Sequence, residues 1–269
     1  MNVNKALTIA GSDSGGGAGI QADLKTFQEL DVFGMSVITA VTAQNTLGVQ
    51  GVYPLPVEGI IQQIDSIEED LRPHAVKTGM LFSSEIIESV AERMKKFQWE
   101  NLVVDPVMIA KGGAPLLKEE AVSALKKHLI PLAKVITPNI PEAEVLTDMN
   151  IYSMDDRKEA AKKLYDMGAQ NVVIKGGHGE DDTLIDLLFD GKEFFEWKSH
   201  RIFTKHTHGT GCTFAAAITA ELAKENTVKN AVEVAKKFIQ AAIEDELRIG
   251  VGHGPTNHWA YKKRQEVLS

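Results

Sequence analysis

A Gly-Thr-Gly run directly before the only cysteine of the chain is the segment with the clearest chemical potential. Gly209, Thr210 and Gly211 precede Cys212, and an apolar helical pattern follows over residues 215–223. Successive backbone N–H groups at a helix N-terminus form a concave donor array that suits the charge on a transferring phosphoryl group. The helix dipole also favours a thiolate at Cys212, which would make it a proton acceptor. An isolated cysteine is more often a small buried hydrophobic residue, but its position after the donor array favours catalysis.

A second glycine-rich segment, Gly11–Gly19, joins a predicted strand to a predicted helix, where backbone amides suit a polar or anionic ligand. It is not a Walker A loop, because no Lys-Ser or Lys-Thr closes it. Gly17, Gly19 and Ala22 match a degenerate dinucleotide fingerprint, but Gln44 stands where that fingerprint needs an acidic residue. A tight turn with no ligand remains an alternative.

Acidic and basic side chains follow three further predicted strands. Glu142 lies three residues after Asn139 at the start of a helix, and Asp105 closes the strand 102–104. Magnesium prefers such hard oxygen ligands and keeps several waters, so Glu142 can bind it directly or through water. A carboxylate in a first helical turn is also favourable without any metal. Lys175 ends another strand and can neutralise phosphate charge.

The elements that must position these residues follow a repeating pattern. Apolar runs bounded by turn residues alternate with segments of helical period, which predicts βα units around a mostly parallel sheet. In such sheets ligands bind beyond the carboxyl ends of the strands. A hairpin with an Asp190-Gly191 turn is expected over residues 184–203, and a helix over 228–247. Strands are predicted at residues 6–10, 35–43, 75–78, 102–104, 135–137 and 172–175.

The length and composition limit the class of protein. A chain of 269 residues with no internal repeat or linker predicts one domain over residues 1–269. The net charge of -8 argues against binding to nucleic acid, because phosphate backbones attract clustered Lys and Arg. The single cysteine favours the cytoplasm, and the absence of a long apolar stretch predicts a protein that is neither secreted nor inserted in a membrane.

Four motifs together resemble the ribokinase-like superfamily, and within it the branch of hydroxymethylpyrimidine and phosphomethylpyrimidine kinases of thiamine biosynthesis. The resemblance covers essentially the whole chain and implies a three-layer α/β fold with a mostly parallel sheet flanked by helices. The motifs are Gly11–Gly19, Asp105-Pro106-Val107-Met108, Asn139-Ile140-Pro141-Glu142 and His208-Gly209-Thr210-Gly211-Cys212.

The resemblance implies roles for the nucleotide side of the site. Gly209–Gly211 would be the anion hole, and Cys212 would accept the substrate proton where most of the superfamily has an aspartate. Phosphoryl transfer through a loose transition state needs only modest help from a base. ATP and Mg²⁺ are the implied cofactors, with Glu142 and Asp105 at the metal. The implied ATP contacts are Lys175, Thr207, Asn139 and Lys111.

For the substrate, the resemblance implies a pyrimidine pocket formed by the first glycine loop and nearby strand ends. Gln44 can both donate to and accept from an aminopyrimidine, although it could instead satisfy a loop backbone. Met80 suits a flat aromatic ring because its thioether is polarisable. The full set of implied contacts is Ala18, Asp23, Gln44, Met80 and Val107.

The resemblance further implies two successive phosphorylations at one site, with a flap over residues 107–113 that closes over the substrate. It also implies a homodimer, in which the strand-rich residues 37–52 would supply the edge of the interface. Pyridoxal kinase is the nearest alternative, since some similar enzymes act on pyridoxal and carry a second cysteine in that flap. Here the flap reads Ile109-Ala110-Lys111, which disfavours pyridoxal. A metabolite-binding protein without turnover is a remote alternative that the intact Cys212 and Glu142 argue against.

Overall fold

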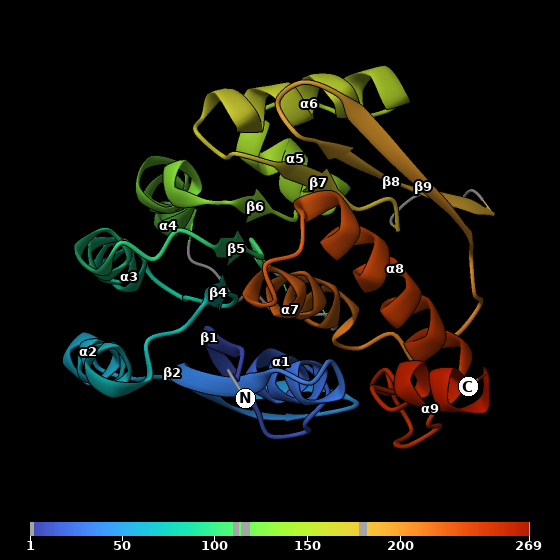
Figure 1. Cartoon of the computed structure of the whole chain (residues 1–269), viewed down its shortest axis with the longest axis horizontal. Coiled ribbons are helices and arrows are strands. Elements are labelled where there is room, and N and C mark those ends of the chain that lie inside the picture. The colour runs from blue at the N-terminus through green and yellow to red at the C-terminus, as the bar shows by residue number, and fades with distance from the viewer. Residues whose placement is uncertain (1–2, 110–112, 114–118, 178–181, 269) are drawn as a thin grey trace.

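The computed structural model describes residues 3–109, 113, 119–177 and 182–268. Within these residues nine strands form one sheet in the order β3-β2-β1-β4-β5-β6-β7-β8-β9 (Figure 1). The central pairs from β2 to β7 are parallel, and β3, β8 and β9 join antiparallel. The strands are β1 (Lys5–Asp13), β2 (Phe33–Asn45), β3 (Gly48–Pro54), β4 (Ala75–Thr78), β5 (Leu102–Val104), β6 (Val135–Ile136), β7 (Val172–Ile174), β8 (Thr183–Phe189) and β9 (Phe194–His200).

Helices cover both faces of the sheet. Figure 1 shows α7 and α8 on one side and α2, α3 and α4 on the other. The helices are α1 (Gly19–Glu29), α2 (Val57–Leu71), α3 (Ser84–Phe97), α4 (Glu119–Ala124), α5 (Ile140–Thr147), α6 (Met154–Asp166), α7 (Thr210–Ala223), α8 (Val228–Glu244) and α9 (Ala260–Leu268). A π-helical turn, Leu125–Leu129, and a 3-10 turn, Ile130–Leu132, follow α4.

The alternation of side chains along each strand explains the three layers. In β5, Leu102 and Val104 belong to one core cluster and Val103 to the other. Because successive strand residues point to opposite faces, each fully apolar strand supplies both cores. The first core packs against α2 to α6, and the second against α1, α7 and α8. The predicted three-layer α/β architecture is confirmed.

The predicted strands are all present, with differences at their ends. β1 continues to Asp13, so the first glycine loop begins later than expected. Gly11 lies within that strand. A side chain at this position would overlap the methyl group of Met80, which explains the glycine. The last long helix ends at Glu244 rather than at residue 247, and β3 forms an edge strand.

The parallel strands all have their carboxyl ends along one edge of the sheet, and the residues with predicted chemical roles follow these ends. β1, β4, β5, β6 and β7 all end there, and α1 and α7 begin there. Among the described helices, none has the length and apolar character that a membrane crossing requires.

Candidate active site

The first glycine loop is held by the carboxylate of Asp13. Asp13 Oδ1 accepts a hydrogen bond from the Gly15 N–H at 2.8 Å, and Oδ2 accepts from the N–H groups of Gly17 at 3.1 Å and Ala18 at 2.9 Å. Burial alone would raise the pKa of Asp13, but the hydrogen bond with His208 and the loop amides lower it. Asp13 is therefore a charged acceptor that fixes the loop before it enters α1 at Ala18.

The two glycine segments pack directly on each other. Gly209 has a φ of +80°, and a side-chain carbon there would overlap the carbonyl oxygen of Gly17. The ring of His208 lies against Gly17 from the same segment. Only glycine at 209 allows both this backbone conformation and this approach. The structure thus brings together the two segments that the sequence suggested as ligand-binding loops.

The N-terminus of α7 opens toward this junction. Its N-cap is Gly209, and no side chain caps the first turn in the part of the chain that is described. The Thr210 hydroxyl donates to the carbonyl of Thr207 at 2.7 Å, which stiffens the entry to the helix. The following amides of Gly211 and Cys212 belong to the first helical turn, where N–H groups lack intrahelical partners. This end of α7 can hold a negative charge.

Burial sets the protonation state of Cys212. It raises the pKa of the thiol to about 12, against the opposing effect of the Lys77 ammonium. The residue keeps some accessible surface, so its sulfur lies at the boundary between the interior and the site. Burial of the charge therefore opposes the thiolate that the helix dipole was expected to favour at Cys212.

A fully buried ion pair lies beneath Cys212. Lys77 Nζ donates to Asp23 Oδ2 at 2.9 Å, and the Thr8 hydroxyl donates to the same oxygen at 2.6 Å. Neither charged side chain has solvent exposure. Burial raises the pKa of Asp23. Burial alone would lower the pKa of Lys77, but Asp23, Cys212 and Asp105 together raise it. Asp23 was expected to line the substrate pocket, but its side chain has no solvent exposure in this structure.

An acidic cluster with one lysine lies on the other side of the α7 N-terminus. Lys175 Nζ donates to Asp105 Oδ1 at 3.2 Å and lies 4.0 Å from Glu142 Oε2. A carbon added to Gly211 would lie 3.4 Å from that Nζ. Burial raises the pKa of Glu142 to about 7 and is opposed by Lys175. Burial would lower the pKa of Lys175, but Asp105 and Glu142 raise it, so the lysine stays charged.

The oxygens of this cluster fit a hard divalent cation. Asp105 Oδ2 is buried and has no hydrogen-bond partner among the described residues. Asn139 and Glu142 form a reciprocal capping box at the start of α5, which fixes the Glu142 carboxylate. Two carboxylates without a third ligating side chain suit magnesium, which relies on water and substrate phosphates for its other ligands. In the described residues no group of three or more His, Cys, Asp or Glu could hold a metal.

The remaining predicted pocket residues are distributed around the same junction. Gln44, the second-last residue of β2, faces His208, with 3.3 Å between the outer end of its side-chain amide and the imidazole Nε2. Met80 covers Gly11, and its carbonyl accepts from the Thr39 hydroxyl at 2.7 Å. Lys111 lies outside the described residues.

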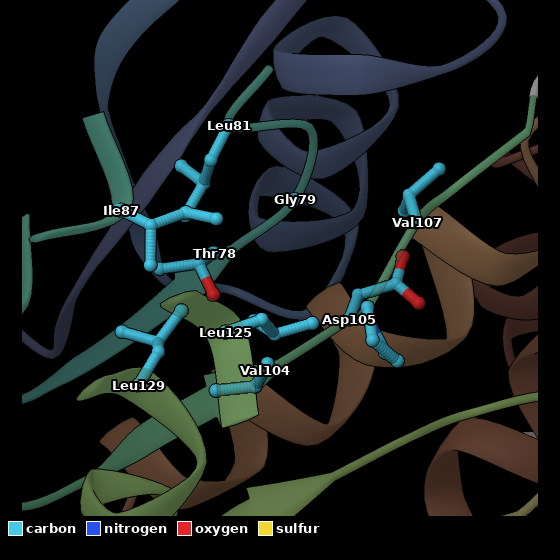
Figure 2. Close-up of a pocket in the computed structure, with 10 residues that line it drawn as sticks. Thr78, Gly79, Leu81, Ile87, Val104, Asp105, Val107, Leu125 and Leu129 are labelled. Carbon is cyan, nitrogen blue, oxygen red and sulfur yellow. The ribbon is translucent and has the colours of Figure 1, made fainter. Parts of the chain in front are cut away.

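Val107 borders a small cavity between β4, β5 and the turn after α4 (Figure 2). The cavity has a volume of about 10 Å³, which is the size of a single water and far too small for a pyrimidine ring. The carboxylate of Asp105 and the side chain of Val107 lie next to each other at its rim (Figure 2). A ring that contacts Val107 must therefore lie in the open site and not in this cavity.

A family model described as phosphomethylpyrimidine kinase matches residues 13–257. The chain belongs to the phosphomethylpyrimidine kinase family. It is 63% identical to the hydroxymethylpyrimidine/phosphomethylpyrimidine kinase of Bacillus subtilis, over 98% of this chain and 97% of that protein. It is 57% identical to the enzyme of the same description from Haemophilus influenzae, over 97% and 99% of the two chains.

Solved structures related to this family member are also kinases. The ADP complex of Bacillus subtilis pyridoxal kinase has a TM-score of 0.90 and 45% identity, covering 97% of this chain and 100% of that one. The Staphylococcus aureus pyridoxal kinase in complex with AMP-PCP and pyridoxal has a TM-score of 0.89 and 40% identity, covering 97% and 95%. The phosphomethylpyrimidine kinase of Clostridium difficile has a TM-score of 0.81 and 47% identity, covering 90% and 100%.

The sequence prediction assigned no individual role to three residues that the structure places at the site, Lys77, Asp13 and His208. Lys77 was detectable, since a lysine inside the apolar strand Ala75–Thr78 must have a buried partner. Asp13, an acidic residue among glycines, is typical of a turn in which the carboxylate binds the following amides. The contact of His208 with Asp13 joins residues 195 positions apart and left no local signal.

Proposed function

We propose that this chain uses ATP to phosphorylate 4-amino-5-hydroxymethyl-2-methylpyrimidine and then its monophosphate to the diphosphate, in thiamine diphosphate biosynthesis. The observation that supports it most is the meeting of Cys212, the uncapped N-terminus of α7 and the cluster around Asp105 at one edge of the sheet. The 63% identity to a hydroxymethylpyrimidine/phosphomethylpyrimidine kinase supports the substrate.

The protein groups divide the reaction between them. The alcohol oxygen attacks the γ-phosphorus of ATP, the bond from that phosphorus to the ADP oxygen breaks, and the first-turn amides of α7 bind the charge on the phosphoryl oxygens. Because the thiol of Cys212 holds its own proton, its sulfur accepts a hydrogen bond from the alcohol and orients it. The alcohol proton leaves late, to an oxygen of the transferred phosphoryl group. Positioning and charge neutralisation therefore supply most of the rate.

The cofactor contacts are also part of this proposal. Asp105 and Glu142 would hold Mg²⁺, directly or through water, while Lys175 would neutralise phosphate charge. The oxygens of Asp105 and Glu142 and the Nζ of Lys175 already lie within one cluster. When bound, Mg²⁺ supplies a positive charge that offsets the phosphates of ATP. Asn139 and Thr207 lie at the same edge and complete the proposed nucleotide side.

The substrate side comprises the exposed edge of the first glycine loop and the end of β2. Ala18, Gln44, Met80 and Val107 are its proposed contacts, with Asp23 acting from beneath. Pyridoxal phosphorylation is a second candidate, since pyridoxal kinases have TM-scores of 0.89 to 0.90 with this chain. Residue 109 is an isoleucine and is exposed, so this part of the flap offers no thiol to an aldehyde.

A coupled assay of ADP release with three acceptors tests the proposed function. We expect turnover with hydroxymethylpyrimidine and with its monophosphate, and a kcat/KM for pyridoxal at least about tenfold lower. Two phosphoryl transfers per pyrimidine must be seen, and Gln44→Ala should raise the KM for the pyrimidine without a matching change in the KM for ATP. Exclusive turnover of pyridoxal, or ADP release without phosphorylated pyrimidine, would refute it.

We infer a homodimer through the edge formed by β2 and β3, because Val41, Leu47 and Tyr53 are exposed along it. Light scattering should then give twice the mass of a 29.4 kDa chain. A cytoplasmic site of action is supported by the single cysteine.

A further inference from the structure

A hydrogen-bond network connects the first glycine loop, the end of β2 and the segment before α7. His208 Nε2 lies 2.8 Å from Asp13 Oδ2 and 3.3 Å from the outer end of the Gln44 side-chain amide. The other end of that amide lies 3.0 Å from the Thr42 hydroxyl. The side chains of His208 and Asp13 are 13% and 4% exposed, so water replaces few of these contacts.

The Asp13 carboxylate decides which groups donate on the His208 side. It already accepts three loop N–H bonds, and the pKa of Asp13 is lowered because His208 and the loop amides together outweigh the effect of burial. An ionised carboxylate only accepts, so His208 Nε2 carries a hydrogen and donates it. The end of the Gln44 amide that faces this same N–H must then be the carbonyl oxygen, because an NH₂ group would oppose a donor.

The Thr42 hydroxyl is compatible with this orientation on the other side. It has a single hydrogen, which can go to the carbonyl oxygen of Ser12 at 2.9 Å or to the Gln44 amide at 3.0 Å. Because the outer end of the amide is the carbonyl oxygen, the end that faces Thr42 is the nitrogen, which donates to the hydroxyl oxygen while the hydroxyl hydrogen goes to Ser12. The nitrogen and oxygen of a glutamine exchange places when the amide turns by 180°, so only the partners can assign them.

The backbone of Gln44 is fixed independently of this choice. Its N–H donates to Ser14 Oγ at 2.8 Å, and the Ser14 hydroxyl donates to its carbonyl at 2.8 Å. With the backbone held in this way, a 180° turn of the side-chain amide exchanges the groups that Gln44 offers to its neighbours. His208 selects one rotation, and Thr42 is satisfied by the same one.

We propose that His208 is a positioning residue that holds the Gln44 carbonyl toward the imidazole and the Gln44 nitrogen toward Thr42, and thereby makes the site selective for an aminopyrimidine over its 4-oxo counterpart. This rests on the proposed function. An aminopyrimidine presents an amino donor next to a ring-nitrogen acceptor, and the 4-oxo ring presents an acceptor next to an N–H donor. An amide held in one orientation matches one of these edges, whereas an amide that turns freely matches both.

The experiment compares kcat/KM for 5-hydroxymethyl-2-methylpyrimidine carrying either a 4-amino or a 4-oxo group. We expect the unmodified protein to prefer the amino substrate by at least about tenfold, since a mismatched polar pair leaves groups unpaired. His208→Ala should bring this ratio toward one. His208→Gln should restore it, because its side-chain NH₂ can donate to both Asp13 and the Gln44 carbonyl.

Further variants separate positioning from a general loss of structure. In a Gln44→Ala background, His208→Ala should leave the ratio unchanged, because no amide remains to be oriented. Thr42→Val should lower the ratio even if His208→Ala does not fold. Equal losses on both substrates in His208→Ala and Thr42→Val, or no preference in the unmodified protein, would overturn the inference. Absence of turnover with either pyrimidine in the unmodified protein would instead refute the proposed function.

Discussion

The surroundings of the Cys212 sulfur decide whether the thiol is protonated at neutral pH. Burial raises its pKa to about 12, while Lys77 beneath it acts in the opposite direction. A thiol in this state is a poor general base at neutral pH but a competent hydrogen-bond partner for an alcohol. The sequence predicted a catalytic role for Cys212 from its position after the Gly-Thr-Gly run. The protonation state was not predictable, because it depends on side chains from three separate elements.

Substitution of Cys212 distinguishes an orienting thiol from a thiolate base. We expect Cys212→Ala to lower kcat by about 10- to 100-fold with little change in the KM for the pyrimidine, because the group acts on the reacting hydroxyl. Cys212→Ser should recover most of that loss, since a neutral hydroxyl can accept the same hydrogen bond. Steady-state kinetics check this. A serine variant as inactive as the alanine variant would require the thiolate.

The raised pKa of Glu142 predicts that magnesium binding depends on pH. Below its pKa of about 7 the carboxyl is protonated, so a proton competes with the cation, and above it the carboxylate is free to bind. Apparent Mg²⁺ affinity should therefore rise as the pH increases from 6 to 8. Titration of activity with Mg²⁺ at several pH values measures this. The same rise in Glu142→Gln would assign it to a different group.

Contacts between elements hold the site together more than any single loop does. α7 meets the loop before α1 through Gly209 and Gly17, while β4 meets α1 through Lys77 and Asp23. The strands and their order along the chain follow from the apolar pattern, because each strand must supply both cores. The partner of Lys77 did not follow, since α1 carries more than one acidic side chain and only packing decides which one faces β4.

Glycine at position 209 is required for the approach of α7 to the first loop. We expect Gly209→Ala to lower the free energy of unfolding by at least about 2 kcal/mol and to abolish most turnover, because the added carbon meets the Gly17 carbonyl in a positive-φ conformation. Gly59→Ala is the matched control, since it lies in α2 with open space around its Cα. It should stabilise by about 0.5–1 kcal/mol and keep activity. Urea unfolding and the kinase assay test both, and equal behaviour of the two would contradict the packing argument.

The buried pair of Lys77 and Asp23 should be costly to break from one side only. We expect Lys77→Met to lower the free energy of unfolding by about 3–5 kcal/mol, because an unpaired carboxylate remains in the core. Combining it with Asp23→Asn should recover part of that loss. A double variant less stable than Lys77→Met alone, measured by urea unfolding, would show that the two side chains do not act as a pair.

At the scale of the whole molecule, the carboxyl ends of the parallel strands carry the proposed pyrimidine side and the proposed nucleotide side, with the first turn of α7 between them. The convergence of these loops was predictable from the sequence, because motif order and strand order jointly place them. The sequence did not predict the burial of Asp23, the link from His208 to Gln44 or the position of Val107 beside a cavity of about 10 Å³. Each of these depends on distances across the fold that no local pattern records.

We propose that the sulfur of Cys212, the amides of the α7 N-terminus and the cluster of Asp105, Glu142 and Lys175 act together on one bound alcohol. A crystal structure with hydroxymethylpyrimidine, AMP-PCP and Mg²⁺ would show whether they do. We predict the hydroxymethyl oxygen within about 3.5 Å of the sulfur and the terminal phosphonate against the first-turn amides of α7. A pyrimidine whose hydroxyl points away from Cys212, or a nucleotide bound at a different edge of the sheet, would contradict the account.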